Sequence, residues 1–161
     1  MQKALIIAIL ILNGGKVYAP SVKQKYEAEI DQYKEFHIEY QYTKKIELIL
    51  ETIRWIESRN NYHIKGGSRE YGAYQFTPST WRDHCKLFFG RQLNIKSPAN
   101  QDVIAQMKIE RLIDKGYELD EIASIWNSGS PKWKGKIGVN RYSVQYNVPR
   151  YVRKFMNEYK N

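Results

Sequence analysis

The sequence predicts a mainly α-helical protein, and three observations carry this prediction. Apolar residues recur at helical spacing in several separate segments, for example at Leu119, Ile122 and Trp126. Thr77-Pro78 and Ser97-Pro98 each join a helix N-cap residue to a proline that suits the first helical turn. No segment shows a convincing alternation of apolar and polar residues with period two, which would indicate half-buried strands. Helices therefore supply most of the predicted fold.

The composition suits one compact domain with a small appendage. The chain has 161 residues, of which 42% are hydrophobic and 27% are charged, so we do not expect disorder over most of the length. The 13 Tyr and 4 Trp offer flat apolar faces with a polar edge, on which sugar rings or nucleobases stack. A net charge of +9 indicates attraction to a polyanion: nucleic acid, an anionic membrane surface or an acidic wall polymer.

Residues 1–19 are typical of an export signal. Lys3 gives a positive start, residues 4–12 form an unbroken apolar run, and small residues up to Ala19 suit a signal peptidase. The run is too short for a permanent transmembrane helix, so we expect a cleaved signal, no stable membrane anchor, and a periplasmic or wall location. An uncleaved anchor is the alternative. Cys85, the single cysteine, is interpreted as a small core residue.

Residues 20–42 predict a helix of their own. An aromatic stripe at helical spacing is expected to pack on the domain or to reach a partner; it comprises Tyr26, Ile30, Tyr33, His37 and Tyr40. Thr43 is the expected N-cap of the next helix, which places a boundary between residues 20–42 and a domain of residues 43–161.

Glu57 breaks the pattern of that next helix. At about 100° per residue, Glu57 projects within roughly 40° of Ile46, Leu50 and Ile53, so a carboxylate ends an apolar stripe. A carboxyl group held against apolar walls has a raised pKa and can carry a proton near neutral pH. This is the property of a general acid that protonates a glycosidic oxygen. The alternative is a frayed last turn in which Glu57 points to water.

The remaining chain predicts short helices joined by loops. Residues 60–71 are polar and Gly-rich and indicate a loop, and residues 132–147 indicate an exposed loop region. Four further helices are expected: from Thr77 or Ser79 to about Phe89, from Ser97 to Gly116, over 119–126, and from about Pro149 with Tyr151, Val152 and Phe155 buried. The three histidines are scattered and no metal-binding or phosphate-binding motif occurs, so neither a metal nor a cofactor is expected.

Three blocks in the same order resemble the lytic transglycosylases of the soluble-lysozyme-like superfamily. Glu57-Ser58-Arg59-Asn60 is similar to that family's Glu-Ser motif. The residues from Gly72 to Phe76, followed by Pro78, resemble its Gly-Leu-Met-Gln-Ile block, and the residues from Ala123 to Gly129 resemble its Ala-Ala-Tyr-Asn-Ala-Gly block. A weaker match sets residues 148–152 against the family's closing Tyr-Val segment. The resemblance covers about residues 43–156 and implies a lysozyme-like helical catalytic domain with an N-terminal helical extension.

The resemblance also implies a reaction and a set of site residues. Glu57 would cleave the β-1,4 bond between N-acetylmuramic acid and N-acetylglucosamine in peptidoglycan and leave a 1,6-anhydromuramic product. The supporting and substrate-binding residues would be Ser58, Tyr74, Gln75, Trp126, Asn127 and Tyr151, with Tyr142 as a further groove aromatic. Each of these side chains has an alternative role: Ser58 as a polar residue at a helix C-terminus, and the others in packing or in holding a loop. Tyr74 and Trp126 depart from the family's usual Met and Tyr, which puts the substrate fit in doubt.

Other functions stay open at this point. A hydrolytic lysozyme would act on the same bond with a second carboxylate, for which Glu70 and Asp83 are the candidates. A non-catalytic peptidoglycan-binding scaffold would keep the fold and the groove. A nucleic-acid partner would explain the charge and the aromatic residues but neither the export signal nor Glu57. The chain also resembles small exported enzymes that open the wall for a secretion or conjugation apparatus, or that act in phage infection or growth, and the sequence does not separate these settings.

Overall fold

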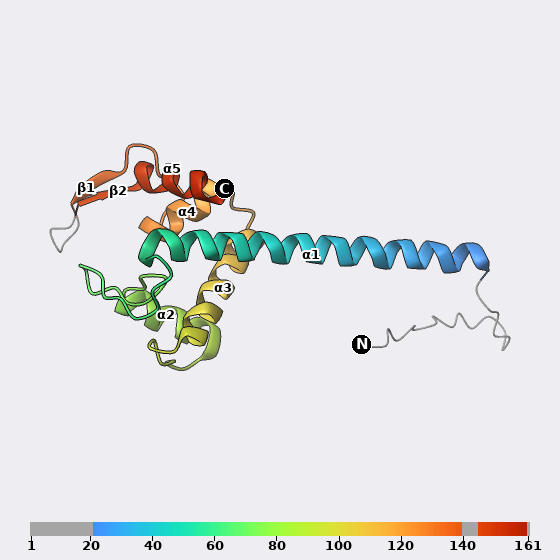
Figure 1. Ribbon diagram of the computed structural model, residues 1–161, viewed down its shortest axis with the longest axis horizontal. Helices are drawn as coiled ribbons and strands as arrows, with labels where there is room; N and C mark the ends of the chain where they lie inside the picture. Colours follow the sequence, from blue (N-terminus) through green and yellow to red (C-terminus); the bar gives the residue numbers. More distant parts are fainter. Residues whose placement is uncertain (1–20, 140–144, 161) are drawn as a thin grey trace. The chain divides into compact units, whose positions relative to one another are not determined.

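The computed structural model describes residues 21–139 and 145–160, and this part of the chain is mainly α-helical. It contains five helices and one two-stranded antiparallel sheet (Figure 1). The predicted export signal and Tyr142 lie outside the described residues. None of the described helices has both the length and the apolar character needed to cross a bilayer. The chain divides into two compact units, residues 1–42 and 43–161.

In the first unit, residues 22–42 belong to helix α1 (Val22–Ser58) and most of their side chains are exposed. The hydroxyl group of Tyr33 lies 2.8 Å from Nε2 of His37, one turn further on, so the predicted helical spacing is present. Among the described residues of this unit, the exposed large apolar side chains are Tyr26, Ile30, Tyr33, Phe36, Ile38 and Tyr40. The helix predicted over these residues is confirmed.

The predicted helix start at Thr43 is wrong, because α1 continues through this residue to Ser58. Neither glycine nor proline occurs between Val22 and Ser58. Threonine costs a helix interior only about 0.5 kcal/mol relative to alanine, which is too little to stop a helix among good helix formers. A potential N-cap residue therefore marks a helix start only where something else prevents the preceding residues from being helical.

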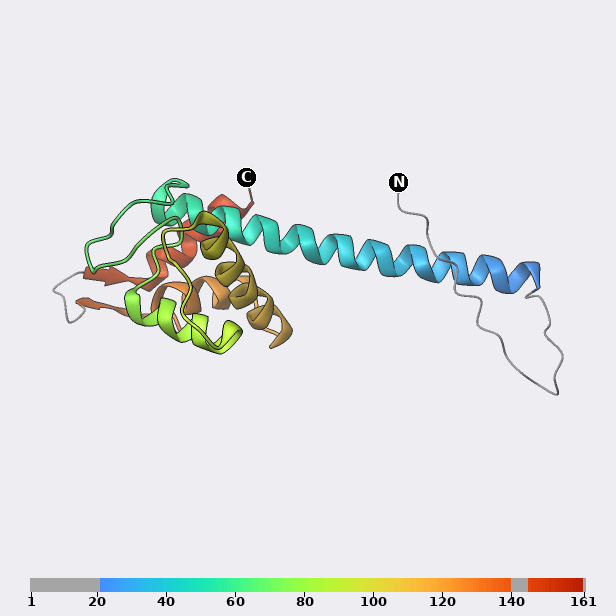
Figure 2. The same cartoon turned by 90° about the horizontal axis from the view of Figure 1, so that it is seen from below.

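In the second unit, helices α2 to α5 gather around the C-terminal end of α1, with α4 packed on α5 and α2 on α3 (Figure 1 and Figure 2). One apolar face of α1 is buried here through Ile46, Ile49, Leu50 and Ile53. The rest of the core comes mainly from Ala73, Tyr74, Phe76, Trp81, Cys85, Ile104, Ala105, Ile109, Leu112, Ile122, Ala123, Val148, Val152 and Phe155. The interpretation of Cys85 as a small core residue is confirmed.

The predicted helix starts with a capping residue and a proline are confirmed. Helix α2 (Pro78–Phe89) is capped by Thr77, whose side chain accepts a hydrogen bond from the backbone N–H of Thr80. Helix α3 (Pro98–Asp114) is capped by Ser97 in the same way. Helix α4 (Leu119–Ser128) ends at Gly129, which has a φ of 73° and closes the helix in the left-handed conformation.

The region predicted as an exposed loop over 132–147 contains a short hairpin instead. Strand β1 (Ile137–Val139) pairs with the antiparallel strand β2 (Gln145–Asn147), with Gly138 opposite Tyr146. Most of these residues are exposed, so the strands have no buried face and no alternation of apolar and polar residues. The prediction failed for this reason. Helix α5 (Val148–Tyr159) follows directly and is capped by Asn147.

Candidate active site

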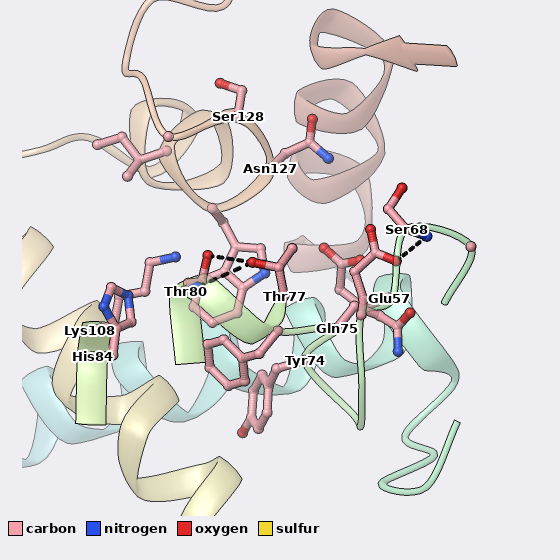
Figure 3. Close-up of a pocket in the computed structure, with 16 residues that line it drawn as sticks. Glu57, Ser68, Tyr74, Gln75, Thr77, Thr80, His84, Lys108, Asn127 and Ser128 are labelled. Atoms are coloured by element: carbon pink, nitrogen blue, oxygen red, sulfur yellow. Dashed lines mark hydrogen bonds between the residues drawn. The ribbon is translucent and has the colours of Figure 1, made fainter. Parts of the chain in front are cut away.

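A cleft of about 710 Å³ lies in the second unit, beside the C-terminal end of α1. Four other parts of the chain supply its walls: the loop before α2, the first two turns of α2 up to His84, the middle of α3 and the end of α4 (Figure 3). The residues that line it are Glu57, Gly67, Ser68, Glu70, Tyr74, Gln75, Phe76, Thr77, Thr80, His84, Lys108, Ile125, Trp126, Asn127, Ser128 and Gly129.

Glu57 lies in the last turn of α1 and points into this cleft. Burial raises the pKa of its carboxyl group from an ordinary value near 4.5 to about 7. The nearby Glu70 charge acts in the same direction, whereas a hydrogen bond from the Tyr151 hydroxyl and the charges of Lys108 and Lys154 act against it. A pKa near 7 allows this carboxyl group both to donate and to accept a proton at neutral pH.

Tyr151 holds one oxygen of Glu57. Its hydroxyl group donates a hydrogen bond of 2.7 Å to Glu57 Oε1, across 94 positions of sequence. The helix α5 positions Tyr151 because Val152 and Phe155 on the same helix are buried in the core. Tyr151 is not among the residues that line the cleft, so its hydroxyl supports Glu57 and does not itself face a ligand there.

The residues after Glu57 fix the end of α1. Ser58 is buried, and its hydroxyl lies 2.9 Å from the Ala73 carbonyl oxygen and 3.1 Å from that of Arg54. It also accepts a hydrogen bond from the Asn61 N–H. Ser58 does not line the cleft, so the substrate contact predicted for it does not fit its place. It joins the end of α1 to the loop that carries Gln75.

Gly72 and Gln101 hold that loop close to α3. Gly72 has a φ of 82°, and a Cβ atom added here would clash with the Gln101 side-chain amide. Gln101 is fully buried and each of its amide atoms has a partner: Oε1 accepts from Ala73 N, and Nε2 donates to the carbonyl oxygens of Tyr62 and Ile95. The loop backbone is thereby fixed relative to α3.

Tyr74 lies under the cleft surface. Its side chain is fully buried, with its ring 5.9 Å from the rings of Phe76 and Trp126. Its hydroxyl donates to Asp102 Oδ1 at 2.8 Å and accepts from Arg54 at 3.2 Å. The structure therefore gives Tyr74 the packing role that was its alternative, and the predicted contact with a sugar does not fit its burial.

Gln75 lines the cleft with an unusual backbone conformation. Its φ is 48°, a left-handed value that costs a residue other than glycine about 1 kcal/mol or more. Its side-chain Nε2 donates to the Gly72 carbonyl oxygen at 2.8 Å, which leaves its Oε1 as a further acceptor near the cleft. Strain of this kind is common where a backbone is held for function.

Trp126 and Asn127 form part of the opposite wall from the end of α4. The Trp126 ring is partly exposed and packs on Phe76, with ring centroids 5.5 Å apart. The Asn127 side chain is exposed and lines the cleft (Figure 3). Five predicted site residues thus meet at this cleft: Glu57, Gln75, Trp126 and Asn127 at its surface and Tyr74 beneath it.

No protein-family model matches this chain, and neither does any curated protein or solved structure.

The two candidates for a second carboxylate have different positions. Glu70 lines the cleft and accepts a hydrogen bond of 2.7 Å from the backbone N–H of Ser68. Asp83 is exposed on α2, 3.6 Å from Arg82, and does not line the cleft. Only Glu70 of this pair is placed to take part in chemistry with Glu57.

Sequence reasoning missed Lys108, His84 and the two threonines of the cleft, Thr77 and Thr80. Lys108 lies 4 residues from both Ile104 and Leu112, which are buried on α3, so it interrupts an apolar face as Glu57 does. A charged residue in this position of the apolar pattern could have indicated Lys108 from the sequence. The described residues contain no group of three or more His, Cys, Asp or Glu that could hold a metal ion.

Proposed function

We propose that this chain is an exported lytic transglycosylase that cleaves peptidoglycan, with Glu57 as its single catalytic acid and base. The observation that carries the proposal is the state of Glu57: a carboxyl group with a pKa of about 7, in a cleft wall, held by the Tyr151 hydroxyl. The resemblance of the blocks around Glu57, Gln75 and Asn127 supports the choice of substrate.

The proposed reaction uses Glu57 twice. The protonated carboxyl group donates its proton to the oxygen of the β-1,4 bond as the bond from that oxygen to the muramic C1 breaks. The resulting carboxylate then takes the proton from the muramic C6 hydroxyl while the C6 oxygen bonds to C1. The product is a 1,6-anhydro sugar, the enzyme regains its proton, and no water is consumed. A pKa near 7 suits both steps because neither protonation state is strongly favoured.

The other cleft residues have supporting roles in this proposal. The partly exposed Trp126 ring offers apolar surface to a sugar beside the Lys108 ammonium, and the Asn127 and Gln75 amides offer hydrogen bonds to hydroxyl or acetamido groups. The acetamido group of the substrate stabilises the charge at C1, so a second carboxylate is not required. The substrate is a glycan strand of the wall, reached from the periplasm or the cell surface.

A hydrolytic lysozyme is the second candidate, and the position of Glu70 favours it. Because Glu70 lines the same cleft as Glu57, its carboxylate is available to activate a water molecule or to stabilise positive charge at C1. Both candidates share Glu57 as the acid, and they differ in the nucleophile that captures C1.

Mass spectrometry of fragments released from purified peptidoglycan separates these functions. Residues 20–161 and the Glu57→Gln variant are compared on the same substrate. Anhydromuramic products from the parent protein alone support the transglycosylase. Reducing-end sugars that disappear in Glu70→Gln support the lysozyme instead. Release of no fragment by the parent protein, with binding retained, contradicts both enzymes and supports a non-catalytic scaffold.

A further inference from the structure

Lys108 places a cation inside the cleft from the buried face of α3. Its neighbours on this face, Ile104, Ile109 and Leu112, belong to the core. The ammonium nitrogen lies 4.0 Å from the centroid of the Trp126 ring, and the side chain lines the cleft. Figure 3 shows Lys108 beside His84 at one end of the cleft and Glu57 near Ser68 at the other end.

The Lys108 ammonium has no carboxylate partner among the described residues. The ion pairs found between described residues involve other cations, among them Arg54 with Asp102 and Lys44 with Glu47. Burial lowers the pKa of Lys108 to about 8, and the Glu57 charge acts in the opposite direction. Keeping a cation in such a place is costly unless an anion compensates it, and the Trp126 ring compensates only in part.

The neighbours of Lys108 at this end of the cleft are hydrogen-bonding groups without negative charge. Nε2 of His84 is buried and has no hydrogen-bond partner in the described part of the chain. Burial lowers the pKa of His84 to about 4, so the ring is neutral at neutral pH. Thr80 also lines this region, with its hydroxyl bonded to that of Thr77. The two carboxyl groups of the cleft are at its other end. Glu57 lies near Ser68 there, and Glu70 accepts a hydrogen bond from the backbone N–H of Ser68.

We propose that Lys108 is a specificity-determining residue that binds a carboxylate of the glycan substrate. This inference rests on the proposed function and names the part of the substrate that the site reads. A muramic residue carries a lactyl group, which ends in a free carboxylate in strands without peptide stems. In strands with stems this group is an amide, and the stems carry carboxylates of their own. A glycan that reaches Glu57 presents one of these anions to Lys108.

A binding experiment on the full chain tests the inference without turnover. In the Glu57→Gln background, N-acetylmuramic acid and N-acetylglucosamine are titrated while tryptophan fluorescence and amide chemical shifts are followed. The expected result is tighter binding of the acidic sugar, with a preference that falls about tenfold or more in Lys108→Met. Lys108→Arg should retain much of the preference. The matched control, Lys86→Met, removes an exposed lysine of α2 and should leave the preference unchanged.

Two results would overturn the inference: equal or absent binding of the acidic sugar in the Glu57→Gln protein, or an unchanged preference in Lys108→Met. A preference that depends on Lys108 in a protein that releases no wall fragments would uphold the inference and reject the enzyme. Anhydromuramic products, together with a preference for the acidic sugar that does not depend on Lys108, would support the enzyme and reject the inference. Thermal unfolding of Lys108→Met shows whether the variant is folded. If it is not, Lys108→Arg still tests the inference, because it keeps the positive charge and should keep the preference for the acidic sugar.

A second arm identifies the source of the carboxylate. The parent protein and Lys108→Met are compared on intact peptidoglycan and on strands from which an amidase has removed the stems. A loss of kcat/KM of about tenfold or more only on stripped strands assigns Lys108 to the lactyl carboxylate. The same loss only on intact strands assigns it to a stem carboxylate. An equal rate for both proteins on both substrates contradicts the inference.

Discussion

At the scale of single residues, the chemistry of the cleft depends on where two charged side chains interrupt apolar helix faces. Glu57 is made protonatable by burial, and the Tyr151 hydroxyl limits this effect because it stabilises the charged form. Lys108 is made less basic by burial in the same cleft. An acid with a raised pKa and a base with a lowered pKa in one cleft are typical of a functional site.

The buried carboxyl group of Glu57 should make stability depend on pH. Its folded pKa of about 7 lies above the unfolded value near 4.5, so its contribution is fully present below about pH 4.5 and is lost as the pH rises through about 7. Glu57→Gln removes this loss. The free energy of unfolding of the variant, relative to the parent protein, should therefore rise by about 1–3 kcal/mol from about pH 4.5 to about pH 8.

Urea unfolding of both proteins across this pH range measures the difference. Glu51→Gln, which changes an exposed carboxyl group on the same helix, is the matched control. The assignment of a raised pKa to Glu57 would be contradicted by either of two results. The difference in the free energy of unfolding between Glu57→Gln and the parent protein could fail to change with pH, or Glu51→Gln could show a change of the same size.

Removing the Tyr151 hydroxyl should raise the pKa of Glu57 further. Tyr151→Phe keeps the ring but loses the hydrogen bond that favours the charged carboxylate, so the pKa should move above about 7. Carbon NMR of labelled glutamate side chains follows this titration directly. The control is Tyr159→Phe. Tyr159 is also a tyrosine of α5, but it does not bond to Glu57. A downward shift in Tyr151→Phe would refute this role for the hydroxyl.

At the scale of elements, the site depends on the junction between the end of α1, the loop before α2, and α3. The Ser58 hydroxyl of α1 donates a hydrogen bond to the Ala73 carbonyl oxygen, and the Ala73 N–H donates one to Gln101 of α3. Tyr74 adds a bond to Asp102, also on α3. Three elements that are distant in sequence therefore fix one short loop, and this loop holds Gln75 in its left-handed conformation.

Replacement of Gly72 should disrupt this junction more than replacement of another left-handed glycine. Gly72→Ala combines a φ of 82° with a clash of the new Cβ against Gln101, whereas Gly90→Ala has a φ of 65° and open space around the Cβ position. Gly90→Ala should lower the free energy of unfolding by about 1 kcal/mol. Gly72→Ala should cost clearly more, about 2–4 kcal/mol, because Gln101 must give up buried hydrogen bonds.

Chemical unfolding of the two variants measures this contrast. Equal losses in Gly72→Ala and Gly90→Ala would mean that the contact between Gly72 and Gln101 does not hold the loop. The release of wall fragments should also fall in Gly72→Ala, because Gln75 follows three residues later.

At the scale of the whole molecule, the buried hydrophobic residues among those described all lie between Ile46 and Phe155, within the unit of residues 43–161. Residues 22–42 are helical, yet their side chains are mostly exposed. The hydrophobic burial that stabilises the fold therefore comes from the second unit.

Residues 43–161 should consequently fold without the preceding segment. We expect a cooperative thermal transition with a Tm within about 5 °C of that of residues 20–161, because no core contact is removed. Circular dichroism measures it. A chain that starts at residue 50 is the control, since it lacks Ile46 and Ile49 and should not fold stably. Failure of residues 43–161 to fold would show that residues 20–42 contribute to stability.

The sequence by itself determined the helices that have strong local signals. Thr77 and Ser97 with their prolines, and Gly129 after a periodic segment, define helix ends through backbone chemistry within a few residues. The interruption of an apolar stripe by Glu57 was likewise local, and the same reading applied to α3 would have found Lys108. The hairpin gave no such signal because its strands are short and exposed.

Only the tertiary structure decided which of the predicted site residues line the cleft and which are buried beneath its surface. Ser58 and Tyr74 are polar residues next to Glu57 and Gln75, and nothing in their local sequence distinguishes support from contact with a substrate. Their roles are set by partners far along the chain, Ala73 for one and Asp102 for the other. The pKa of Glu57 is decided in the same way, because burial and a hydroxyl 94 positions away arise only when the helices pack.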